Sequence, residues 1–140
     1  MSELIVAPDI EAALVQHLNA QFAVRSVGTQ FVCEAVTEVP DPRPDRLVRV
    51  THAGGPRRNR ITDSPVVIFE AWAPTKPAAS QLGRLTEALV LATDGTWIGT
   101  PPVWIEGAAS SGGISYFPDP DTSLPRYQFT LQLFTNCEVQ

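Results

Sequence analysis

Three arginines, Arg57, Arg58 and Arg60, directly follow a Gly-Gly-Pro turn in the stretch THAGGPRRNRITD (51–63). Arginine carries planar, bidentate donors that fit a carboxylate or a phosphate. Such a cluster could therefore hold a phosphate, a nucleic-acid backbone or the acidic side chains of another protein. The arginine turn is the first candidate for a binding site in this sequence.

Basic residues gather in one part of a chain that is acidic overall. The 140 residues have a formal net charge of -5, yet six of the ten lysines and arginines lie within positions 43–60. These six are Arg43, Arg46, Arg49, Arg57, Arg58 and Arg60. Nucleic-acid readers are more often basic overall, with aromatic residues interleaved for stacking. The pattern favours a solvated hairpin tip or pairing with another chain, and leaves contact with DNA or phosphate as an alternative.

The sequence contains none of the common catalytic or cofactor motifs, such as GxSxG, GxxxxGK[ST] or HExxH. Cys33 and Cys137 lie far apart and are expected to be buried thiols, and His17 is expected to pack at the edge of the core. Asp119 and Asp121 lack the glycine and distal glutamate of a calcium loop, which predicts a solvated, proline-shaped turn. We therefore expect no catalytic, metal or cofactor-binding residue, and a protein that is not an enzyme.

Hydrophobic spacing predicts two helices. The first runs from about residue 8 to 22, begins at Pro8-Asp9 and continues with apolar residues at helical spacing. The second runs from Lys76 to about Thr93. The apolar residues expected to face the core are Ile10, Ala13, Leu14, Leu18 and Phe22 in the first helix, and Leu82, Leu85, Leu89 and Ala92 in the second.

Alternating patterns predict a sheet. Strands are expected at 30–39, 46–52, 61–73, 114–117 and 126–134, and long loops rich in proline and glycine at about 40–46 and 94–113. The strands 46–52 and 61–73 should form a hairpin through the arginine turn, with Pro65 marking an edge position or a bulge. The element order predicts an α+β fold, a single domain over residues 1–140 in which two helices pack on one face of a mainly antiparallel sheet.

Two tryptophans, Trp97 and Trp104, lie within the expected loop 94–113. A loop tryptophan commonly folds back over the core of its own domain. An exposed aromatic side chain can instead anchor a partner protein. Both roles are open for this pair.

The N-terminal segment and the apolar runs of the sequence predict neither a secretion signal nor a membrane span. The segment MSELIVAPDIEAAL (1–14) has neither the basic region nor the apolar run of a secretion signal, and no apolar stretch approaches the length that spans a bilayer. We expect a soluble protein made in the cytoplasm.

Several stretches together resemble a known family. GGPRRNRITD (54–63), FEAWA (69–73) and PRYQFTLQL (125–133) occur in this order, between an N-terminal helix and the chain end, with an Ala/Leu helix after the second. The chain resembles the tail terminator proteins of long-tailed phages (siphoviruses) that infect actinobacteria, over about residues 8–135.

The resemblance implies a structural virion protein of the phage tail, assembled in the host cytoplasm. It implies a homo-hexameric ring that caps the head-proximal end of the tail tube, stops its polymerisation and joins tail to neck. The partners would be other copies of the chain, the tube protein and a neck or head-completion protein, with DNA only passing through the lumen. The alternatives are a head-closure or neck adaptor and a nucleic-acid-binding module.

The arginine turn, the matched stretches and the tryptophan loop together define an expected interface. It comprises Arg49, Arg57, Arg58, Arg60, Asp63, Trp72, Trp97, Trp104 and Arg126. No catalytic residue, metal ligand or cofactor is implied by the resemblance.

Overall fold

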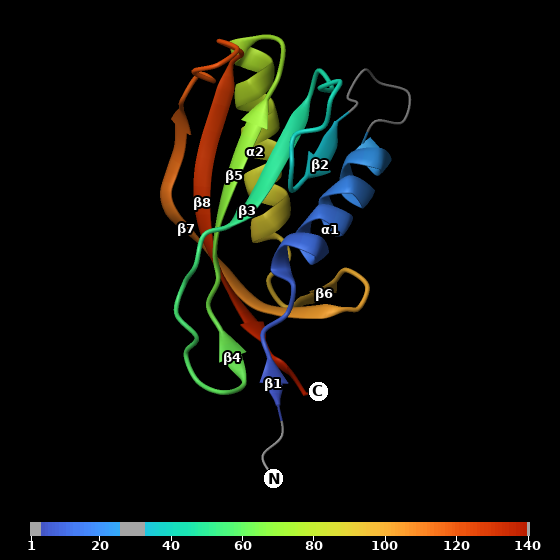
Figure 1. Cartoon of the computed structure of the whole chain (residues 1–140), viewed down its shortest axis with the longest axis vertical. Helices are drawn as coiled ribbons and strands as arrows, with labels where there is room; N and C mark the ends of the chain where they lie inside the picture. The colour runs from blue at the N-terminus through green and yellow to red at the C-terminus, as the bar shows by residue number, and fades with distance from the viewer. Residues whose placement is uncertain (1–3, 26–32, 140) are drawn as a thin grey trace.

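A curved sheet forms the body of the computed structural model, which describes residues 4–25 and 33–139. The strand order in the main sheet is β2-β3-β5-β8-β7-β6, with β4 also paired to β8 and a separate pair β1-β9. The strands are β1 (Ile5–Val6), β2 (Glu34–Val36), β3 (Leu47–His52), β4 (Thr62–Asp63), β5 (Val66–Trp72), β6 (Thr96–Ile98), β7 (Val103–Tyr116), β8 (Arg126–Asn136) and β9 (Glu138–Val139). The helices are α1 (Ile10–Arg25) and α2 (Lys76–Leu91). Figure 1 shows both helices on one side of the sheet.

This arrangement confirms the predicted α+β fold with two helices on one face of a mainly antiparallel sheet. Among the described residues only β2 and β3 pair in parallel, and the other strand pairs are antiparallel. Of the strand predicted at 30–39, only 34–36 is strand, and residues 30–32 lie outside the described part. The expected loop 40–46 contains no strand.

The first helix starts where its sequence favours a start. The Asp9 carboxylate accepts a hydrogen bond of 3.1 Å from the Ala12 N–H and so caps the first turn. All five residues expected to face the core are buried. Each large apolar side chain buried in this way stabilises the fold by about 1.5–3 kcal/mol.

The second helix is capped by the Thr75 hydroxyl, which accepts a hydrogen bond of 3.3 Å from the Ala78 N–H. Leu82 and Leu89 are buried as expected and Leu85 is partly buried, whereas Ala92 is exposed just after the helix ends. The core therefore lies between both helices and the inner face of the sheet.

The central strands meet through a predicted hairpin. β3 and β5 are antiparallel with Val50 opposite Phe69, and β5 pairs with β8, where the rings of Phe69 and Phe129 stack with centroids 5.0 Å apart. Pro65 lies in a two-residue break between β4 and β5. The edge position or bulge expected there is wrong, because β5 is a central strand between β3 and β8. β4 and β5 keep the same register with β8, because Asp63 lies opposite Thr135 and Val66 opposite Gln132.

The prediction of a long loop at 94–113 is wrong. Residues 96–98 and 103–113 belong to β6 and β7, which form a hairpin around a short turn containing Gly99 at φ 79°. The error arises because the strand segment 107–113 is made of glycine, alanine and serine, which have little intrinsic strand preference. Pairing with β8 along most of its length holds this segment in the sheet.

Candidate functional site

The arginine turn forms a projecting arm, residues 53–61, that extends beyond the body of the sheet (Figure 1). Arg57 holds the arm together. Its Nη2 donates to the backbone carbonyls of Ile5, at 2.7 Å, and Arg60, and its Nε donates to the carbonyl of Asn59 at 3.2 Å. The guanidinium of Arg57 thus binds backbone of its own chain.

Further contacts fix the shape of the arm. The side-chain oxygen of Asn59 accepts hydrogen bonds of 2.9 Å from the N–H groups of both Ile61 and Thr62. Gly55 has φ 104°, and a Cβ there would lie 2.2 Å from the carbonyl oxygen of Ser64, so only glycine fits. The predicted contact residue Asp63 is only 7% exposed and accepts a hydrogen bond from the Ser64 N–H. It therefore supports the base of the arm.

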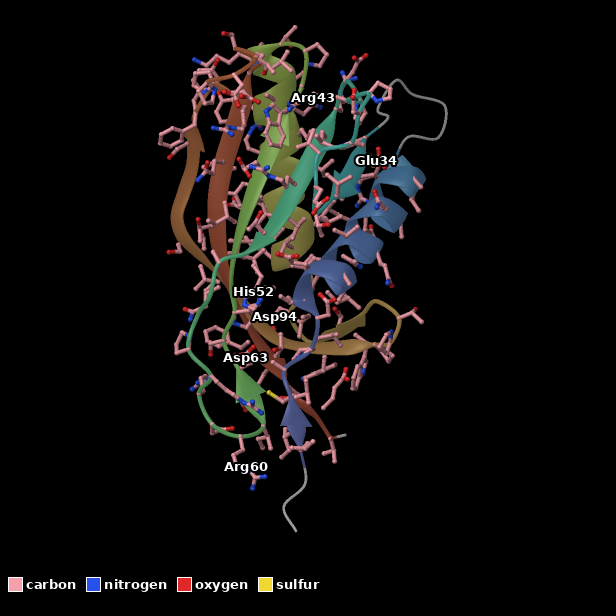
Figure 2. The ribbon with its side chains drawn as sticks, viewed as in Figure 1. Glu34, Arg43, His52, Arg60, Asp63 and Asp94 are labelled. Atoms are coloured by element: carbon pink, nitrogen blue, oxygen red, sulfur yellow. The ribbon has the colours of Figure 1, made fainter. Side chains whose placement is uncertain are left out.

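The other two arginines of the arm are exposed. The guanidinium of Arg58 lies over the ring of Phe134, with its carbon 5.4 Å from the ring centroid. Figure 2 shows Arg60 at the end of the arm, with its side chain directed away from the sheet. Ile5, Arg57, Asn59 and Arg60 line an open depression of about 420 Å³. These positions present positive charge on a preformed surface.

The structure brings Arg49, Trp72 and Arg126 together at the other end of the sheet, on the face without helices. Glu70 joins the two arginines: its Oε1 lies 2.7 Å from Arg49 Nη2, and its Oε2 lies 2.9 Å from Arg126 Nη1. Both guanidinium groups lie over the Trp72 ring, 5.5 Å from its centroid. This cluster covers Glu70 and Trp72 on the face of β5 that is opposite the core, whereas Val66 and Ile68 on the same face are half-buried.

The tryptophan of this cluster is covered by the chain itself. Trp72 is 2% exposed, and its indole N–H donates to Asp119 Oδ2 at 3.0 Å. Arg43, from the loop 37–46, lies 5.0 Å above the same ring and 3.6 Å from Asp119 Oδ2. A side chain so buried offers no surface to a partner, so Trp72 does not provide the direct interface contact predicted for it.

The expected turn exists and is exposed at residues 120–123, Asp121 included, but Asp119 itself is only 7% exposed, so the prediction is wrong for this carboxylate. Burial acts to raise its pKa, but hydrogen bonds from the Asp121 N–H and the Trp72 indole outweigh burial and bring the pKa below its usual value. Asp119 therefore remains charged and attaches the segment after β7 to the sheet.

Trp97 and Trp104 lie opposite each other on the hairpin of β6 and β7, with ring centroids 5.2 Å apart. Trp97 is 64% exposed, and Trp104 is half-buried. Trp97 consequently does not fold back over the core, and its ring is accessible to a partner.

The remaining candidates for chemistry are isolated. His17 and both cysteines are half-buried, so neither thiol is as deeply buried as expected. Burial lowers the pKa of His17 and raises the pKa of Cys33 to about 12. Within residues 4–25 and 33–139, no three potential ligands gather into a metal site, and no helix is long and apolar enough to cross a membrane.

Sequence reasoning missed Glu70, Asp119 and Arg43 as members of the tryptophan cluster. A signal for Glu70 existed, since it alternates with Trp72 on the strand face opposite the core residues Phe69 and Ala71. Comparisons with protein-family models and with curated proteins find no match to this chain.

Proposed function

We propose that this chain is a structural virion protein that forms a homo-hexameric ring on the head-proximal end of a phage tail tube. The ring stops tube polymerisation and joins the tail to the neck. The proposal starts from the sequence resemblance, and the preformed arginine arm is the observation that supports it best. The chain acts by assembly and carries out no catalysis.

The arm is suited to contact with a neighbouring copy because its shape exists before any contact. Arg57 and Asn59 fix its backbone through several hydrogen bonds, so docking costs little additional ordering. Arg58 and Arg60 then present two exposed guanidinium groups. A closed ring needs two different complementary patches on each copy, and arginines on one flank with carboxylates on the other would supply them.

Charge fits the passage of DNA through such a ring. Six copies would carry 6 × -5 = -30 formal charges. Affinity for phosphate comes mainly from lysine and arginine, so a lumen lined by acidic residues would let DNA pass without binding it. Arginines placed between subunits would leave the lumen acidic.

The test is charge reversal at the exposed arginines of the arm. The double variant Arg58→Glu/Arg60→Glu should fold but fail to form rings or to cap purified tail tubes, as seen by electron microscopy. Arg25→Glu/Arg84→Glu makes the same change in net charge on the helices and should assemble normally. Normal capping by the arm variant would count decisively against the proposal.

The same preparation separates the alternatives. A head-closure or neck adaptor would bind the portal side and leave tube ends bare. A nucleic-acid-binding module would retain duplex DNA at low salt and lose it steeply as salt rises. We expect capped tube ends and no retention of DNA.

A further inference from the structure

The two edges of the main sheet end differently. On the β2 edge, the side-chain amide of Asn19 donates to the carbonyl of Ala35 at 3.0 Å and accepts from its N–H at 2.8 Å. On the same side, Glu11 accepts a hydrogen bond from the N–H of His52 in β3. Both side chains come from α1. This helix therefore satisfies outward-facing backbone groups that another strand would otherwise bind.

The opposite edge has no such cover in the described part of the chain. β6 pairs with β7 only at Val103–Ile105, and beyond Ile105 the described partner of β7 is β8 alone. Figure 1 shows β7 as the outermost strand of the sheet over this length. The segment 106–116 is thus an open sheet edge.

The pairing of β8 shows which backbone groups of this edge face outward. Leu133 N–H donates to the Pro65 carbonyl, on the side of β8 that faces β5. Successive residues of a strand direct their backbone groups to opposite sides, so Gln132 directs its groups to β7. Its partner there is Ala109. The backbone of Ala109 therefore faces β8.

By the same alternation, the N–H and C=O groups of Ala108 and Ser110 face away from the sheet. The residues around them are small, and segment 107–116 contains no proline and no charged side chain. Natural proteins usually protect an open edge with lysine, proline or a covering element. Here the open edge is interrupted only by the register irregularities at 105–107 and 111–115. Between them, five residues with regular pairing remain, 107–111.

We propose that this edge binds β7 of a second copy of the chain, in antiparallel pairing about a two-fold axis at Ala109. The axis places Ala108 opposite Ser110 of the second copy, and each such pair exchanges both of its backbone hydrogen bonds. Residues 107–111 are all uncharged, so no like charges meet within the paired stretch. The segment is self-complementary, and this surface is separate from the arginine arm.

A cysteine at the axis provides the first test. Ala109 is exposed, and across the axis two such residues form a pair without hydrogen bonds, with Cβ atoms about 4.5–5.5 Å apart. In a Cys33→Ser/Cys137→Ser background, Ala109→Cys should give a disulfide-linked dimer under mild oxidation. The matched control Ser115→Cys, exposed on the same strand beyond the irregularity, should give little. Equal cross-linking of the two variants would refute the pairing.

Charge exchange provides the second test. In sedimentation velocity, the unaltered protein should show a dimer that grows with concentration. Ala109→Lys and Ala109→Glu should each lose this dimer, because like charges would face each other across the axis, and a mixture of the two should restore it. Circular dichroism should show that both variants fold, because position 109 is exposed.

The outcomes separate this proposal from the ring. A protein that shows no dimer at any concentration, or charge variants that dimerise like the unaltered protein, would overturn the pairing. The ring proposal is judged separately, by capping of purified tube ends. Conversely, Arg58→Glu/Arg60→Glu should abolish rings and leave the Ala109 dimer intact.

Discussion

The guanidinium of Arg57 donates a hydrogen bond of 2.7 Å to the backbone carbonyl of Ile5, fifty-two positions earlier in the chain. This contact joins the arm to β1, which pairs with β9. The direction of the arm is thereby fixed relative to both terminal strands. All three arginines of the arm are exposed, but Arg57 supports the arm because its guanidinium binds three backbone carbonyls.

Replacing Arg57 should loosen the arm without unfolding the sheet. Arg57→Ala leaves the carbonyls of Ile5, Asn59 and Arg60 without their common donor, and we expect a loss of about 1–2 kcal/mol in unfolding free energy. Amide exchange at residues 61–63 should become faster. Arg58→Ala is the control and should leave exchange there unchanged. Equal protection in both variants would show that Arg57 has no supporting role.

Removal of Glu70 should be more costly than removal of a surface carboxylate. Glu70→Ala leaves Arg49 and Arg126 beside Trp72 without their shared carboxylate. We expect the free energy of unfolding to fall by about 2–3 kcal/mol. This is at or below the low end of the cost of breaking a fully buried ion pair, because Arg49 is partly exposed. Urea unfolding measures it, with exposed Glu38→Ala as control. A change within about 0.5 kcal/mol would mean that water replaces the carboxylate without cost.

Asp119→Ala should detach the segment that follows β7. The Trp72 indole N–H, buried under this segment, would lose its acceptor, which costs about 1–3 kcal/mol. The fluorescence of Trp72 should change as water reaches the ring. The control is Asp121→Ala, which changes an exposed residue two positions later and should have little effect on either measurement. Similar values for the two variants would argue against the hydrogen bond.

His17 should make stability depend on pH. Burial lowers its pKa in the folded state below 6.5, so the unfolded chain binds a proton at a higher pH than the folded chain does. The neutral, half-buried imidazole therefore contributes to the free energy of unfolding above pH 6.5, and this contribution is lost as the pH falls from 6.5 through the lower pKa of the folded state. Asp119, with a folded pKa below 3.8, acts only at more acidic pH. Urea unfolding between about pH 8 and pH 5 should show a smaller decrease for His17→Gln.

Trp97 should contribute little to folding. Its ring is 64% exposed and contacts Trp104, so Trp97→Ala should cost about 0.5–1.5 kcal/mol. Trp72→Ala, in contrast, should cost at least about 3 kcal/mol because that ring is fully covered. If Trp97→Ala folds normally and yet fails to cap tube ends, the exposed ring contacts the tube or neck protein. If it caps normally, Trp97 is not part of that contact.

Local periodicity predicted the helices and the hairpin of β3 and β5. Ile10 to Phe22 follow helical spacing on a single face, and such a pattern needs no information from distant residues. The prediction failed for segment 107–113 because this segment is a strand through its pairing with β8, and glycine, alanine and serine give no local signal for a strand.

The arm and the tryptophan cluster also differed in how far the sequence could predict them. The arginine turn could be found because its residues are neighbours in the sequence. Glu70 and Asp119 are far apart in the chain, and both meet Trp72 or its arginines only after the sheet forms. The supporting role of Arg57 depends on Ile5, which no spacing within the turn reveals.

The Asn19 and Glu11 contacts also limit how far copies of this chain can associate through their sheets. Fibre growth requires every molecule to accept a neighbour on both margins. In the described part of the chain, α1 covers one edge of the sheet at Ala35 and His52, and β7 leaves the opposite edge open. If copies pair through the open edge, the pairing therefore ends at two copies, and continuous ribbons of the amyloid type cannot grow from this sheet.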